Sequence, residues 1–148
     1  MIVIGSDHAG LALKRQVLHV LAELGHEVED VGVDEERSVD YPDFAHTVAA
    51  RVAAGDAAGI LICGTGLGMS MAANRHPGVR AALCHDAYTA EMARRHNDAN
   101  LLCMGGRVVG PGVAEQIVRV FLDTPFEGGR HQRRVAKIEL PEHRREEP

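Results

Sequence analysis

The sequence predicts an α/β protein: a single-domain, doubly wound (Rossmann-like) three-layer sandwich with a five-stranded parallel sheet and a C-terminal helix. Three observations predict it. Five short apolar runs alternate with longer segments of helical period. The chain has 148 residues, which suits one domain with a sizeable core. Glycine-rich loops follow two of the apolar runs, where strands of an open parallel sheet end at a ligand site.

The strands are predicted from the apolar runs, and the helices from apolar spacing and terminal signals. The segment from Leu11 to Leu24 has helical spacing and stops at Gly25, a common residue after a helix. Pro42 and Pro111 suit the first turns of helices, and Asp86 is a good N-cap. The predicted strands are 2–4, 27–31, 59–62, 79–83 and 101–104, and the predicted helices are 11–24, 42–54, 69–74, 87–95, 112–122 and 130–140.

Composition excludes several classes of function. The formal net charge is -5, with no Lys/Arg-dense stripe before the last stretch, which argues against binding to nucleic acid. The chain opens on an apolar strand without a basic leader and has no apolar stretch of about 18 residues, so we expect a cytoplasmic protein without a membrane partner. Residues 1–140 are predicted to form the domain, and the charged segment 141–148 a disordered tail.

Two loops at predicted strand ends, Gly5 to Gly10 and Cys63 to Gly68, carry the first functional signal. The second precedes a helix, so its N–H groups and the positive helix end favour an anion. It lacks the third glycine of the dinucleotide fingerprint because Met69 stands there, and the first loop lacks the Lys-Ser/Thr of a P-loop. We expect an oxyanion or phosphate site, with tight turns that only relieve backbone strain as the alternative.

The three cysteines are an odd number, which favours free thiols over a disulfide framework. Cys84 and Cys103 lie within apolar strand patterns, as small buried residues do. Cys63 instead ends a strand beside the glycine-rich turn, where helix-end dipoles favour a thiolate that acts as base or nucleophile. The sequence therefore singles out one thiol for chemistry.

The basic residues have two interpretations each. His96 lies in a polar cluster at a predicted helix end, where it either complements the helix dipole or binds a ligand. Arg130 and Arg134 share a helix face, where they either clamp a phosphate or stay solvated. The nine histidines are scattered singly, without metal-ligand spacing, so the sequence predicts no metal site.

Five segments in this order carry a family resemblance: Ser6–Gly10, Asp40–Pro42, Cys63–Ser70, His96–Asn100 and Gly128–Gln132. With them the chain, from about Met1 to Leu140, closely resembles the ribose-5-phosphate isomerase B family, which also includes galactose-6-phosphate isomerase subunits. The resemblance implies an aldose–ketose isomerase that acts on a sugar phosphate through a cis-enediolate, without metal or cofactor. Ribose 5-phosphate is the expected substrate. A tetrulose, allose or galactose phosphate, a noncatalytic sugar-phosphate-binding module and a thiol hydrolase are the alternatives.

The resemblance also implies roles for individual residues. Some family members have a glutamate base at the position of Met69 and glycine at that of Cys63, so this chain falls in the cysteine-base branch. Cys63 then moves the proton, and a homodimer or dimer of dimers shares the active sites. The anion hole comprises the backbone amides of Gly64, Gly66 and Gly68, helped by Asn97. The groups that bind sugar hydroxyls and open the ring are Asp7, Thr65 and His96. The phosphate clamp, partly from a neighbouring subunit, comprises His8, Arg107, Arg130 and Arg134.

Overall fold

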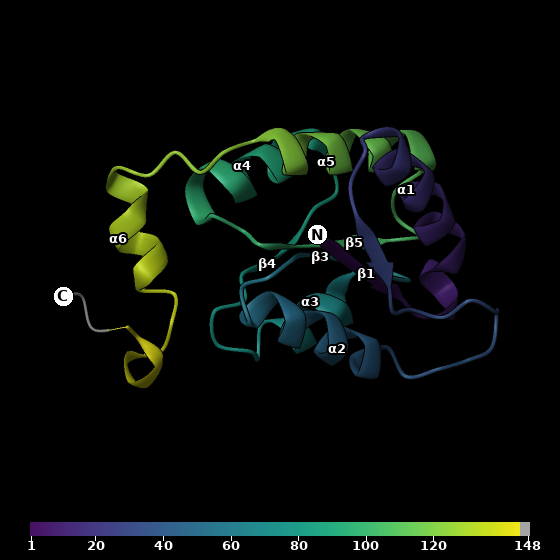
Figure 1. Cartoon of the computed structure of the whole chain (residues 1–148), viewed down its shortest axis with the longest axis horizontal. Helices are drawn as coiled ribbons and strands as arrows, with labels where there is room; N and C mark the ends of the chain where they lie inside the picture. The colour runs from purple at the N-terminus through teal and green to yellow at the C-terminus, as the bar shows by residue number, and fades with distance from the viewer. Residues whose placement is uncertain (146–148) are drawn as a thin grey trace.

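The computed structural model describes residues 1–145 and confirms the predicted α/β architecture (Figure 1). Five parallel strands form one sheet in the order β2-β1-β3-β5-β4. The strands are β1 (Ile2–Ser6), β2 (Val28–Asp30), β3 (Ala58–Cys63), β4 (Ala81–Leu83) and β5 (Leu101–Gly105). The helices are α1 (Leu11–Glu23), α2 (Tyr41–Ala53), α3 (Leu67–Ala73), α4 (Ala87–Asn97), α5 (Pro111–Asp123) and α6 (Arg130–Ala136), with short 3-10 turns η1 (His8–Gly10) and η2 (Pro141–His143).

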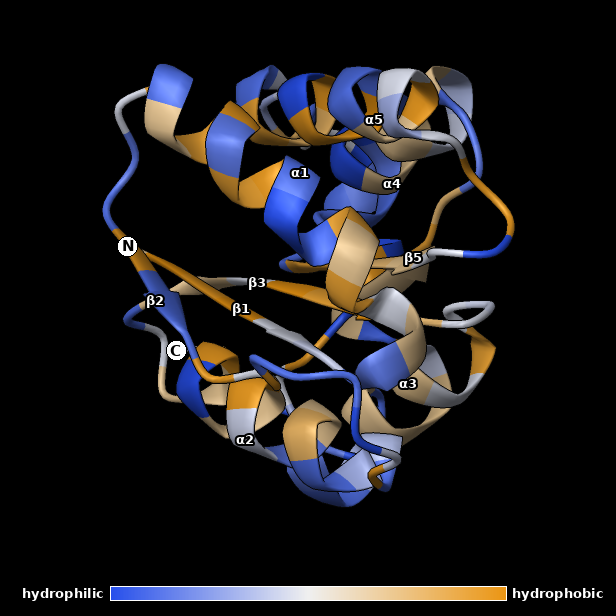
Figure 2. Cartoon of the chain, turned by 90° about the vertical axis from the view of Figure 1, so that its right-hand side faces the viewer, coloured by the Kyte–Doolittle hydropathy of each residue, from blue (hydrophilic) through white to orange (hydrophobic). Residues whose placement is uncertain are grey.

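The sheet is covered on both faces, which makes the three predicted layers (Figure 2). Helices α1, α4 and α5 pack on one face, and α2 and α3 on the other. Successive side chains of a strand point to opposite faces, so Ile2 and Ile4 enter the first core and Val3 enters the second. On β3 the same alternation sends Cys63 to the face covered by α2 and α3.

The chain changes direction between β1 and β3, which are neighbours in the sheet. Helix α1 leaves β1 on one face, and α2 leads into β3 from the other. The loops after these two strands therefore diverge toward opposite faces at their carboxyl ends, which is the position of the ligand-binding crevice in open α/β sheets. The loops after β1 and β3 are the two glycine-rich segments of the sequence.

Some predicted boundaries shift, for local reasons. Helix α3 begins at Leu67, two residues early, because Thr65 Oγ1 accepts a hydrogen bond from the Leu67 N–H at 3.2 Å. Helix α4 continues to Asn97 and ends where Asp98 adopts a left-handed conformation, with φ 45°. Strand β2 stops at Asp30, whose carboxylate turns back to accept from the Gly32 N–H at 2.9 Å. These contacts involve side chains that apolar periodicity does not register.

The chain end also differs from its prediction. Helix α6 stops at Ala136 rather than near residue 140, because the N–H groups of Lys137 and Ile138 bond to the carbonyls three residues back and tighten the last turn. The apolar side chains of Ile138 and Leu140 beyond it are exposed. In the predicted tail, residues 141–143 form η2 and residues 141–145 are exposed. The remaining residues of that tail, 146–148, lie outside the described residues. No helix in the described part of the chain is long and apolar enough to cross a membrane.

A buried lysine fastens the segment after β2. Lys14 on α1 is 1% exposed, and its ammonium lies 2.8 Å from a carboxylate oxygen of Asp30. The same ammonium donates to the carbonyl oxygen of Val33. A buried charge must be paired to be tolerated, and here the pair ties α1 to the loop that leads toward α2. That loop reaches the carboxyl edge of the sheet, where the Val39 N–H donates to Nδ1 of His8.

Candidate active site

Three loops meet at the carboxyl edge of the sheet, after β1, β3 and β5. The Asp7 N–H donates to the Ile62 carbonyl at 3.3 Å, which joins the first two loops. The Gly106 N–H donates to the Cys63 carbonyl at 2.8 Å, and the Arg107 N–H to the Gly64 carbonyl at 3.0 Å. The structure therefore brings seven predicted residues to one edge: Asp7, His8, Cys63, Gly64, Thr65, Gly66 and Arg107. Gly68, in the first turn of α3, completes this group.

Cys63 is the last residue of β3, and its thiol faces the glycine-rich turn. The side chain is buried, and the Gly66 N–H donates to its Sγ at 3.1 Å. A hydrogen bond donated to sulfur stabilises the thiolate more than the neutral thiol. Burial raises the pKa of Cys84 to about 11 and that of Cys103 well above its ordinary value. Both therefore remain protonated near neutral pH, and both are buried, as their apolar strand patterns predicted.

The loop after Cys63 is too closely packed for larger residues at two of its glycines. Gly66 has φ 79°, and a Cβ there would lie 2.5 Å from Cδ1 of Leu83 and 2.9 Å from the backbone carbon of Met104. A Cβ at Gly68 would lie 2.4 Å from the ring of Tyr41. Glycine at these positions therefore lets the loop rest against β5 and against the start of α2.

Two further side chains at this edge have defined partners. Asp7 is buried, and its Oδ1 accepts from the Gly10 N–H at 3.0 Å, so it caps η1. Nδ1 of His8 accepts from the Val39 N–H at 3.3 Å. A neutral imidazole that accepts at Nδ1 carries its proton on Nε2, so His8 presents a donor to an incoming anion.

Tyr41 contacts the glycine-rich loop, although the sequence pattern predicted no role for it. Its ring lies against Gly68 on the glycine-rich loop, and about two-fifths of the side chain stays exposed. The available signal was its place in the segment Asp40–Pro42, which carried part of the family resemblance without a stated role.

The other predicted residues lie at the opposite edge of the sheet. Helix α4 follows the carboxyl end of β4 and ends just before the start of β5, so His96 and Asn97 lie at the amino edge. The Gly59 N–H donates to the Asn100 carbonyl at 3.0 Å, which anchors this region near the beginning of β3. A five-residue strand spans roughly 16 Å, so these residues do not reach Cys63 of the same chain.

Arg130 and Arg134 belong to this second group. Both are exposed on α6, which packs against α4 and projects from the body of the domain (Figure 1). One chain therefore assembles the predicted site in two halves. The carboxyl edge holds Cys63 and the glycine-rich loop, and the amino edge holds His96, Asn97 and the two arginines. The sequence alone did not separate these two groups. After each strand the chain runs back along a helix to the amino edge, so residues at the end of a helix lie far from the ends of the strands.

Comparison with known proteins identifies the family. The family model described as Ribose/Galactose Isomerase matches residues 2–138. The ribose-5-phosphate isomerase B of Escherichia coli (strain K12) is 48% identical over 145 residues, with 97% of each chain covered. The D-erythrulose-4-phosphate isomerase of Pectobacterium atrosepticum is 42% identical over 144 residues, with 96% of this chain and 95% of the relative covered.

Solved structures agree with these matches. The structure of Clostridium thermocellum ribose-5-phosphate isomerase B is 54% identical, covers 93% of each chain and has a TM-score of 0.91. The chain therefore belongs to the ribose/galactose isomerase family. The prediction of an aldose–ketose isomerase is confirmed by this membership.

Proposed function

We propose that the protein interconverts ribose 5-phosphate and ribulose 5-phosphate in the cytoplasm, with the Cys63 thiolate as the base. The observation that carries the proposal is the place of Cys63 Sγ, at the carboxyl end of β3 beside the strand switch point and 3.1 Å from a backbone N–H donor. Met69, where some family members have a glutamate, is a fully buried side chain of the α2/α3 core and has no acid–base chemistry. The base role therefore falls to the thiolate.

The proposed reaction moves one proton between adjacent carbons. The thiolate takes the proton from C2 of the open-chain aldose. The electron pair left behind forms the C1–C2 double bond of a cis-enediolate, while the π pair of the C1 carbonyl moves onto O1. The thiol then returns the proton to C1, while a proton passes from O2 to O1. The atoms and electrons balance without a redox cofactor. A base whose protonation matches the working pH contributes roughly 10²- to 10⁴-fold to such a step.

The charge that develops on the enediolate oxygens needs fixed donors. We assign these to the backbone amides of Gly64, Gly66 and Gly68, with the side-chain amide of Asn97 from a second copy. The Gly66 N–H is shared between Cys63 Sγ and the substrate in this assignment. Loss of one such donor typically costs about 3 kcal/mol of transition-state stabilisation. Asp7 and Thr65, with His96 of the second copy, are assigned to the sugar hydroxyls and to ring opening. His8 and Arg107 hold the phosphate.

A second copy of the chain completes the site in this proposal. His96, Asn97, Arg130 and Arg134 lie at the edge opposite Cys63, so they can serve only another chain's crevice. Helix α3, directly after the glycine-rich loop, also exposes the apolar side chains of Leu67 and Met71, the latter 66% exposed. Exposed apolar side chains beside a site mark a surface for association. We therefore propose a homodimer, or a dimer of dimers, with shared active sites.

Mixing two inactive variants tests the shared site. Cys63→Ala and His96→Gln are each expected to lose at least about 100-fold in turnover while still binding inorganic phosphate within a few-fold of wild type. When the two are unfolded and refolded together, half of the dimers pair one variant with the other, and each such pair contains one intact site. About a quarter of the wild-type activity should return. No recovery would refute the shared site, and near-normal turnover of Cys63→Ala would refute the proton-transfer role.

The alternative substrates differ in carbon number. One relative with 42% identity is named a D-erythrulose-4-phosphate isomerase, which keeps a four-carbon sugar phosphate as the second candidate. Purified protein should be assayed with four-, five- and six-carbon sugar phosphates. A preference of more than about 100-fold for a sugar other than the pentose would correspond to about 2.7 kcal/mol of discrimination and would overturn the ribose assignment. Absence of turnover with all of them would favour the noncatalytic binding module.

A further inference from the structure

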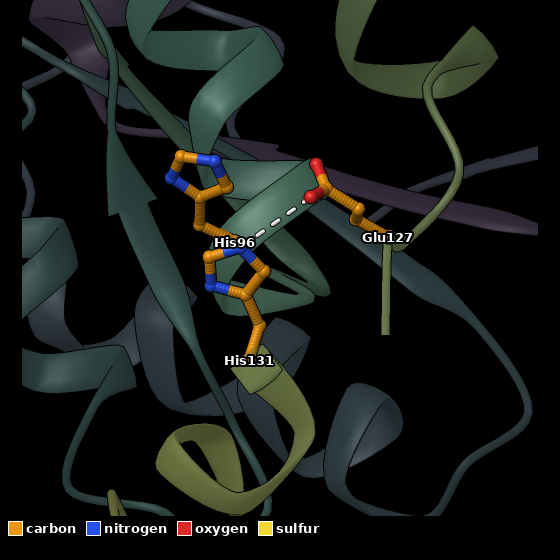
Figure 3. A group of neighbouring side chains, drawn as sticks. All are labelled: His96, Glu127 and His131. Carbon is orange, nitrogen blue, oxygen red and sulfur yellow. Dashed lines mark ion pairs between the residues drawn. The ribbon is translucent and has the colours of Figure 1, made fainter. Parts of the chain in front are cut away.

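Three side chains of the types that bind metal ions meet at the amino edge of the sheet (Figure 3). His96 comes from the last turn of α4, Glu127 from the connection between α5 and α6, and His131 from the first turn of α6. Their ligand atoms all lie within 4.8 Å of one another. The two imidazole rings stack with centroids 4.3 Å apart and planes 13° from parallel. The residues are 31 and 4 positions apart in the chain, so sequence spacing did not predict the cluster.

The deepest of the three has an unsatisfied nitrogen. His131 is 5% exposed, and its Nε2 is buried without a hydrogen-bond partner among residues 1–145. The Glu127 carboxylate lies 3.6 Å from this nitrogen, which is an ion-pair distance rather than a hydrogen bond. Buried polar atoms without partners are rare, and each one leaves a donor or acceptor free for a ligand.

We propose that His96, Glu127 and His131 form a binding site for a divalent transition-metal ion of the zinc class. Two imidazole nitrogens and one carboxylate are a common zinc ligand set, and they leave the fourth tetrahedral position to water. Imidazole ligands favour zinc, copper and nickel over magnesium and calcium, which prefer oxygen. In a tetrahedral zinc site with bonds of about 2.1 Å, the ligand atoms lie roughly 3.4 Å apart.

The cluster must contract to reach that size, and two of its three side chains have room to move. His131 is fixed by burial, and the Glu127 backbone N–H donates to the Arg95 carbonyl at 3.1 Å, which positions the connection. The side chain of Glu127 is half exposed and free to turn, and His96 is only partly buried. The stacked rings hold their nitrogen lone pairs in two nearly parallel planes, so the His96 ring must rotate before both imidazoles can bind one ion.

The surrounding charge makes the site modest in affinity. Arg94 is held by Asp98 at 3.0 Å, and Arg95 by Glu91 at 2.9 Å, so these two cations are already paired. Arg130 is exposed and adjoins His131 in the chain. Its positive charge opposes a metal ion, and only the Glu127 carboxylate offsets that charge within the ligand set.

Occupation of this site has a consequence that rests on the proposed function. In that proposal, His96 opens the sugar ring in the crevice of a second copy. A metal ion bound to the His96 imidazole occupies a nitrogen that ring opening requires. We therefore expect zinc to inhibit the isomerase reversibly, through a ligand set that lies outside the Cys63 loop.

Isothermal titration of the metal-free full-length protein with ZnCl₂ tests the site, with Co²⁺ as a spectroscopic probe of tetrahedral geometry. Wild type is expected to bind one ion per chain, and Glu127→Gln and His131→Gln are each expected to bind at least tenfold more weakly. The exposed pair His46 and His76, whose ring nitrogens lie 2.8 Å apart, is the competing surface site, so His46→Gln serves as the matched control. Unchanged binding in both cluster variants, or loss of binding in the control, would overturn the proposal.

Turnover measurements separate this proposal from the proposed function. Glu127 is exposed and outside the proposed catalytic set, so Glu127→Gln should fold and turn over normally while losing its sensitivity to zinc. EDTA should restore the inhibited wild type. Zinc binding by a protein without isomerase activity would refute the proposed function alone. Isomerase activity with no zinc binding would refute the metal site alone, and equal inhibition of Glu127→Gln and wild type would refute the inhibitory role.

Discussion

Gly66→Ala should lower both the free energy of unfolding and the turnover rate, and the local geometry gives the size of each effect. A non-glycine residue in the left-handed region costs roughly 1–2 kcal/mol. The added Cβ would also lie 2.9 Å from the backbone carbon and 3.0 Å from the carbonyl oxygen of Met104 on β5, which cannot turn aside as a side chain would. Overpacking of this kind typically costs a further 1–3 kcal/mol or so. The expected loss is about 2–5 kcal/mol, a large part of a typical domain's 5–15 kcal/mol or so.

The same substitution should move the Gly66 N–H away from Cys63 Sγ. A displacement of about 1 Å in a catalytic constellation can cost roughly 100-fold in rate, so we expect at least that loss in kcat/KM. Gly55→Ala is the matched control, because Gly55 also has a positive φ, 87°, but nothing lies within 4 Å of its Cβ position. That variant should lose only about 1–2 kcal/mol and keep its activity.

Urea denaturation and initial-rate assays on both variants measure these effects. If Gly66→Ala lost no more stability than Gly55→Ala, the close packing of the loop against β5 would make no measurable contribution to the free energy of unfolding. If it matched in kcat/KM as well, the hydrogen bond from Gly66 to Cys63 would have no part in the reaction. Either result would refute the reasoning that links the loop's geometry to the thiol.

Two further predictions concern buried ionisable groups. Lys14→Met should lower the free energy of unfolding by about 1–3 kcal/mol, because it leaves Asp30 without its cation. Arg37→Met, in an exposed pair with Glu35, should change the free energy of unfolding by less than about 0.5 kcal/mol. Equal effects of the two substitutions would contradict the structural role of the buried pair. Burial raises the pKa of Cys84 from 9.0 to about 11, so its contribution to stability is complete below pH 9 and is lost as the pH rises through about 11, at about 1.4 kcal/mol per pH unit. Unfolding curves of wild type between pH 8 and 11 should therefore fall more steeply than those of Cys84→Ala, and parallel curves would contradict the burial argument.

Much of the fold was predictable because apolar alternation and helix signals are local. The runs around Ile4, Ile62 and Leu102 were each identified as strands, and residues after two of them as the ligand loops. Boundaries set by single side chains were not predictable in this way. Thr65 starts α3 early, and Asp98 ends α4 late, through contacts that leave no periodic pattern.

The site was predictable in composition but not in arrangement. Cys63 and its glycine-rich loop could be placed from the chain order of one strand and one turn. His96 and Asn97 could not, because their edge of the sheet depends on how α4 returns across it. His131 was not assigned at all, since its contacts with His96 and Glu127 depend on where α6 docks against α4.

The division of the proposed site between the two edges of the sheet ties catalysis to self-association. In this proposal an isolated chain would contain two incomplete half-sites and would not turn over substrate, even when it is fully folded. Specific activity should then fall on dilution, along the same curve as the mass measured by light scattering. The concentration of active enzyme would then depend on the concentration of associated chains, rather than on the total concentration of chain.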